Sequence, residues 1–63
     1  MIDLKIERER SDLTQRKLAE LVGVDRSTIA NIEAGRIRPR GSLAKRLGGA
    51  LSVPWTAFFT ERG

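Results

Sequence analysis

Three polar residues of this chain are spaced so that one face of a helix would carry them together. At about 100° per residue, Arg26, Ser27 and Asn31 share one side of such a helix, and Ile29 and Ile32 share the opposite side. An arginine on such a face donates two parallel hydrogen bonds to guanine O6 and N7. An asparagine pairs with adenine N6 and N7 or holds a phosphate, and a serine contacts a base or a phosphate.

These residues also have interpretations without a ligand. Arg26 could form a salt bridge with Asp25 or Asp12, and Asn31 could be a neutral polar residue in mid-helix. An ordinary surface helix is more often filled with Glu and Lys. The short polar side chains therefore favour a face onto which a partner docks.

The charge distribution points the same way. The chain has 12 Lys and Arg against 8 Asp and Glu, a net charge of +4. No acidic residue lies between Glu33 and Glu61, whereas five basic residues do: Arg36, Arg38, Arg40, Lys45 and Arg46. Such a run is either a solvated face or a surface that faces phosphates, and its place directly after the polar helix favours phosphates.

Composition excludes several classes of function. The chain contains no Cys, His or Tyr, so we expect no disulfide, no metal site, no cofactor and no catalytic constellation. No apolar run approaches the roughly 20 residues that span a bilayer, so we expect a cytoplasmic protein without membrane contact. At 63 residues we expect one domain, 1–63, with no small-molecule ligand and with residues 60–63 fraying.

The elements that position the polar face are predicted to be five short helices without strands. Their expected ranges are about 2–10, 15–22, 26–34, 42–51 and 54–59. Thr14 and Asp25 are expected N-caps, and Gly23 and Gly35 are expected helix ends. The pair Gly48-Gly49 weakens the fourth helix, which needs tertiary support or ends early.

Side-chain periodicity assigns the buried faces. Residues 18, 19, 21 and 22 are expected to form an inward stripe, and Ile2 and Ile6 an apolar pair. We expect Glu33 to pair with Arg8, because an acid would face DNA badly and this one lies at the edge of its helix. Such a pair would fix the first helix against the third.

The residues LTQRKLAELVGVDRSTIANIEAG at 13–35, the Arg36–Pro39 turn and residues 43–59, which end in LSVPWTAFF, together carry a resemblance. They are similar to the Cro/repressor-like (Xre-type) helix-turn-helix domains of phage repressors and bacterial regulators. The resemblance implies an all-α, compact five-helix lambda-repressor-like DNA-binding domain, with the motif at about 14–34. It also implies a bacterial or phage-encoded, nucleoid-associated protein.

The resemblance assigns roles by position. It implies that Arg26, Ser27 and Asn31 face base edges, and that a second group contacts phosphate or backbone: Gln15, Thr28, Arg36 and Arg40, to which the basic run adds Arg38. Two departures concern the end of the fourth helix. Ser52 stands where the family usually has glycine, and Gly48 and Gly49 replace better helix formers.

The expected function is a sequence-specific regulator of transcription, a repressor acting as a homodimer on double-stranded DNA with a palindromic operator. Trp55, Phe58 and Phe59 are either core residues or candidates for the dimer interface. One alternative is the antitoxin of a toxin–antitoxin pair, with a toxin as protein partner. The other is a protein-interaction module without DNA binding, which Arg26, Ser27 and Asn31 argue against.

Overall fold

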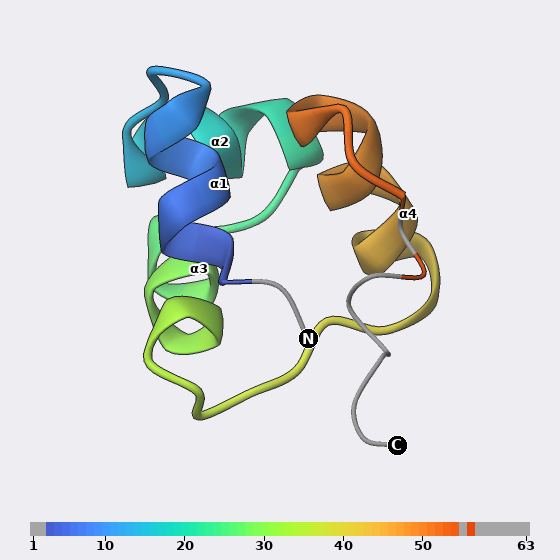
Figure 1. Ribbon diagram of the computed structural model, residues 1–63. Helices are drawn as coiled ribbons and strands as arrows, with labels where there is room; N and C mark the ends of the chain where they lie inside the picture. The colour runs from blue at the N-terminus through green and yellow to red at the C-terminus, as the bar shows by residue number, and fades with distance from the viewer. Residues whose placement is uncertain (1–2, 55, 57–63) are drawn as a thin grey trace.

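The computed structural model describes residues 3–54 and residue 56. This part of the chain contains four α-helices and no strand: α1 Leu4–Arg10, α2 Gln15–Val22, α3 Arg26–Glu33 and α4 Gly41–Leu51 (Figure 1). The all-α class is confirmed. The expected fifth helix at about 54–59, with Trp55, Phe58 and Phe59, lies almost wholly outside the described residues, as do residues 60–63. No described helix has the length and hydropathy needed to cross a membrane.

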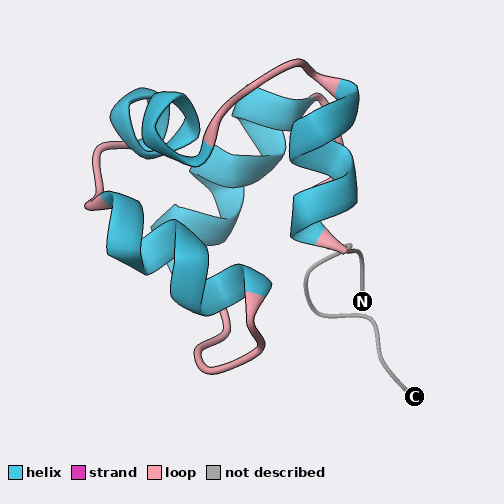
Figure 2. Ribbon diagram, turned by 90° about the vertical axis from the view of Figure 1, so that its left-hand side faces the viewer, coloured by secondary structure: helices cyan, strands magenta, loops and turns pink. Residues whose placement is uncertain are grey.

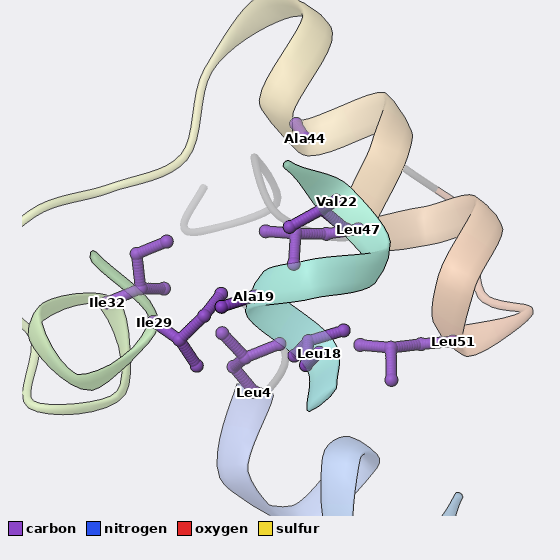
Figure 3. Close-up of a cluster of buried hydrophobic side chains, with 9 residues drawn as sticks. All are labelled: Leu4, Leu18, Ala19, Val22, Ile29, Ile32, Ala44, Leu47 and Leu51. Atoms are coloured by element: carbon purple, nitrogen blue, oxygen red, sulfur yellow. The ribbon is translucent and has the colours of Figure 1, made fainter. Parts of the chain in front are cut away.

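The core forms around α2. Leu18, Ala19 and Val22 of α2 are buried, and the close-up shows α3 on one side of this helix and α4 on the other (Figure 3). Ile29 and Ile32 enter from α3, Leu4 from α1, and Ala44, Leu47 and Leu51 from α4. Leu18, Ile29 and Leu47 have no exposed surface. Burial of these side chains is therefore what fixes α3 relative to α2.

Local signals set the ends of α1 and α2. Thr14 Oγ1 accepts the backbone N–H of Lys17 at 3.0 Å, which caps α2 at its start. Gly23, in the left-handed region at φ +77°, ends α2, and its N–H donates to the carbonyl of Ala19. Asp3 Oδ1 accepts the N–H of Ile6 at 3.2 Å, so α1 begins at Leu4, two residues later than expected.

Two of the predicted apolar positions are not in the core. Leu21 was expected to face inward but is 55% exposed. Ile6, expected to form an apolar pair with Ile2, is 48% exposed, and Ile2 lies outside the described residues. At about 100° per residue, Leu21 lies on the far side of Leu18 from Ala19. The helices packed on α2 cover the part of its surface between Leu18 and Ala19, so Leu21 stays exposed to solvent.

The glycine pair does not end α4, which continues to Leu51. Ala44, Leu47 and the backbone of Gly48 are buried, so tertiary packing offsets the low helix propensity of glycine. Ser52 then ends the helix in the left-handed region at φ +58°, at the position where the family usually has glycine.

Candidate nucleic-acid interface

The polar face of α3 lies on the surface, opposite the core. Arg26 and Ser27 are exposed and Asn31 is half-buried, while Ile29 and Ile32 on the other side are buried. Thr28, expected to contact phosphate or backbone, is half-buried at the edge between the two faces. The helix therefore presents an arginine and two small polar residues outward. Figure 2 shows how the short turn before α3 and the loop after it leave that helix at the edge of the fold.

The N-terminus of α3 differs from the prediction in one respect. Asp25 stands at the N-cap position, but its carboxylate accepts no hydrogen bond from the helix. Its backbone carbonyl accepts the N–H of Thr28 at 3.0 Å instead. The expectation of a side-chain cap here is therefore wrong. Asp25 still places a negative charge beside the positive end of the helix dipole.

The structure brings Arg8 and Glu33 together beneath this face. Arg8 Nε donates to Glu33 Oε2 at 2.6 Å and Nη2 donates to Oε1 at 3.4 Å. The two side chains are only 10% and 7% exposed. The hydrogen bond to Glu33 raises the pKa of Arg8 above its ordinary value, against the opposing effect of burial. The guanidinium therefore remains charged, and it ties α1 to the last residue of α3.

Arg8 has a second structural task. Its Nη1 donates to the backbone carbonyl of Leu13 at 2.7 Å. That carbonyl lies in the turn between α1 and α2, so one guanidinium holds the turn and α3 at once. Glu9 adds a longer contact at 4.0 Å, but its side chain is 57% exposed and contributes little.

Gln15 extends the Arg8–Glu33 pair toward the surface. Its Nε2 donates to Glu33 Oε1 at 3.0 Å, and its Oε1 accepts from Arg26 Nη1 at 3.3 Å. A chain of hydrogen bonds thus runs from Arg8 through Glu33 and Gln15 to Arg26. Because guanidinium only donates and carboxylate only accepts, the orientation of the Gln15 amide is fixed from both sides.

The sequence did not indicate that Gln15 would contact Glu33 and Arg26. The resemblance implied that Gln15 contacts phosphate and supports the third helix, but it named neither of these two partners. The three residues come from the first turn of α2 and the two ends of α3, so only the crossing of these helices brings them together. The Nε2 group has two hydrogens, and the contact with Glu33 uses one of them.

The basic loop after α3 is anchored by an apolar residue. Pro39 is among the largest fully buried side chains, whereas Arg38 and Arg40 on either side of it are exposed. Burial of the proline ring anchors the loop to the rest of the fold, while the two flanking arginines stay at the surface. The sequence indicated a loop here but gave no signal that its proline would be buried.

Arg36 and Arg46 also make contacts within the chain. Arg36 Nη1 donates to Asn31 Oδ1 at 3.3 Å. Arg46 Nη1 donates to the carbonyl of Val22 at 3.2 Å, at the C-terminal end of α2. Arg46 was grouped with the phosphate-facing run, but the structure gives it a structural contact. It joins α4 to α2 and places a positive charge where the α2 dipole is negative.

This arrangement defines a helix-turn-helix unit, in which α2 is followed by a glycine turn and by a second helix with a free polar face. Comparison with known families agrees: the helix-turn-helix family model matches residues 4–58. The chain belongs to the Cro/repressor-like (Xre-type) helix-turn-helix family.

A curated relative comes from Methanothermobacter thermautotrophicus and is named an uncharacterized HTH-type transcriptional regulator. It is 50% identical to this chain over 44 residues, which are 70% of this chain and 64% of the relative. The match thus spans somewhat less than two thirds of the relative's length.

Proposed function

We propose that this chain is a DNA-binding regulator of transcription, with α3 as the helix that reads the major groove. One observation carries the proposal: the exposed guanidinium of Arg26 is held in place from below. Gln15 accepts from Arg26, and Glu33 accepts from Gln15. A side chain that is positioned before binding loses less conformational freedom on binding. Family membership and the printed name of the relative support the same class.

In the proposed complex, the polar face and the basic loop have different tasks. Arg26, Ser27 and Asn31 contact base edges, and Arg26 is suited to guanine. A second set of residues contacts phosphate and releases counterions: Gln15, Thr28, Arg36, Arg38 and Arg40. The second Nε2 hydrogen of Gln15 is the donor we assign to a phosphate. Phosphate contacts then set the register, and base contacts set the sequence preference.

We further propose that the protein binds as a homodimer to a palindromic operator and represses transcription by occluding the polymerase. The support is geometric. One helix-turn-helix unit covers one half-site, and two units related by a two-fold axis would read half-sites about 34 Å apart, one turn of DNA. Trp55, Phe58 and Phe59, which lie outside the described residues, remain our candidates for the dimer interface.

Selection from a pool of random duplex DNA tests this proposal. The full chain is expected to enrich a palindrome with half-sites about one turn apart, with affinity that falls steeply as salt rises. Salt-sensitive binding without an enriched sequence would contradict base reading by α3. Enrichment of a single half-site would contradict the dimer but leave base reading intact.

A further inference from the structure

The end of α3 ties Arg36 to Asn31 through the backbone. Gly35 lies in the left-handed region at φ +80°, where a residue with a Cβ is strained. This conformation turns the chain back, so that the N–H of Gly35 donates to the carbonyl of Ile32 at 3.1 Å and the N–H of Arg36 donates to that of Asn31 at 2.9 Å. These two bonds form a Schellman motif.

The side chains of the same two residues are also joined. Arg36 Nη1 donates to Asn31 Oδ1 at 3.3 Å. A guanidinium has no acceptor, so the amide of Asn31 must turn its oxygen toward Arg36 and its NH₂ group away. Arg36 is therefore attached to Asn31 twice, and the contact determines which way the Asn31 amide faces.

This orientation bears on which base Asn31 can read. An asparagine that reads adenine uses its oxygen to accept from N6 and its nitrogen to donate to N7. With Arg36 beside the oxygen, the N6 amino group of adenine would meet a cationic donor. Guanine has the O6 acceptor in place of that amino group, so the outward NH₂ group of Asn31 can donate to N7 or O6 and no base donor meets Arg36.

We propose that Arg36 is a positioning residue that makes Asn31 select guanine over adenine at one base-pair position. The inference rests on the proposed function, since it assumes that α3 reads bases. It adds to the phosphate contact proposed for Arg36, because the loss of a phosphate contact alone lowers affinity for all sequences alike. Arg36 also acts on sequence preference through Asn31.

The test compares five versions of the full chain on the DNA site that the wild type selects. They are the wild type, Asn31→Ala, Arg36→Met, the double variant and Arg40→Met. Methionine keeps most of the side-chain length and removes both the charge and the donors. Arg40→Met is the matched control, because it removes the same groups from the same exposed loop. Affinity is measured for the selected site and for every single-base substitution within it.

The expected result has four parts. Asn31→Ala removes the preference at one position, and the wild type prefers guanine there. Arg36→Met lowers the guanine-over-adenine ratio at that position at least about threefold, a part of the roughly 5- to 150-fold that a good base contact provides. In the Asn31→Ala background, Arg36→Met changes no preference further. Arg40→Met lowers affinity uniformly, with a salt slope shallower by about one.

Other outcomes overturn the inference, and they separate it from the proposed function. If Arg36→Met behaves like Arg40→Met, or if the position is adenine, Arg36 does not position Asn31 for guanine. If Arg36→Met changes the preference in the Asn31→Ala background, Arg36 reads the base itself. If Asn31→Ala removes no preference, Asn31 is not a reader. If the wild type enriches no sequence at all, the proposed function fails.

Discussion

Removing either partner of the Arg8–Glu33 pair should strongly destabilise the fold. Both side chains are about nine-tenths buried, and the loss of one partner from a buried pair costs about 3–5 kcal/mol. Each partner would keep one hydrogen bond: Arg8 keeps the one to the carbonyl of Leu13, and Glu33 keeps the one from the amide of Gln15. We therefore expect Glu33→Ala and Arg8→Ala each to lower the free energy of unfolding by about 3 kcal/mol.

That loss is large for a chain of 63 residues. Stabilities of about 0.05–0.15 kcal/mol per residue give roughly 3–9 kcal/mol in total, so either variant approaches the limit of folding. Urea titration followed by the far-ultraviolet circular dichroism of the helices measures the effect. With a slope of about 1 kcal/mol per molar urea, the midpoint should fall by about 3 M.

Arg10→Ala is the matched control on the same helix. Arg10 pairs with Glu7 at 3.3 Å, but its side chain is 71% exposed, so its loss should cost at most about 0.5 kcal/mol. The free energy of unfolding of the double variant Arg8→Met with Glu33→Leu should lie within about 1 kcal/mol of that of the wild type, because no unpaired charge is left buried. Single variants that cost less than about 1 kcal/mol, or a double variant as unstable as their sum, would refute the reasoning.

Three further predictions concern helix ends and packing. Ser52→Gly should raise the free energy of unfolding by about 0.5–1 kcal/mol, because Ser52 has a left-handed φ of +58°; a loss of stability in urea titration would contradict this. Thr14→Ala should lower the free energy of unfolding by about 1 kcal/mol, and Asp25→Ala by less, because Thr14 makes a side-chain cap bond and Asp25 does not; equal urea midpoints would argue against the cap. Ala19→Leu should cost about 1–3 kcal/mol by overpacking, since Ala19 is 3% exposed in the core between helices; a stability equal to the wild type would show that the core has room.

Local sequence signals predicted most of the helix boundaries. Thr14 and Gly23 determine the ends of α2 through their own cap bond and backbone conformation, so its range of 15–22 is confirmed. The same reasoning placed Asp25 correctly at the N-cap of α3, but it did not show that the side chain makes no hydrogen bond to the helix there. The prediction that Leu21 faces inward was wrong, because periodicity gives the width of an apolar stripe but not the part of it that neighbouring helices cover.

The hydrogen-bonded chain beneath α3 could be predicted only in part. A lone acid at the edge of α3 suggested the Arg8–Glu33 contact, which the structure shows at 2.6 Å. The links from Glu33 to Gln15 and from Gln15 to Arg26 depend on how α2 crosses α3, and no local pattern encodes that angle. The Arg36–Asn31 contact likewise requires the turn at residue 35 to be known in three dimensions.

The most direct test of the account is the sequence preference of an Arg26→Ala variant. The measured quantity is the affinity for the selected site divided by that for a scrambled duplex, at one fixed salt concentration. The account predicts that Arg26→Ala lowers this ratio roughly 5- to 150-fold, as expected for the loss of one base contact worth about 1–3 kcal/mol. Arg10→Ala, which removes the same charge from α1, should leave the ratio unchanged. An Arg26→Ala variant that binds more weakly but keeps the wild-type ratio would contradict the claim that α3 reads bases through this residue.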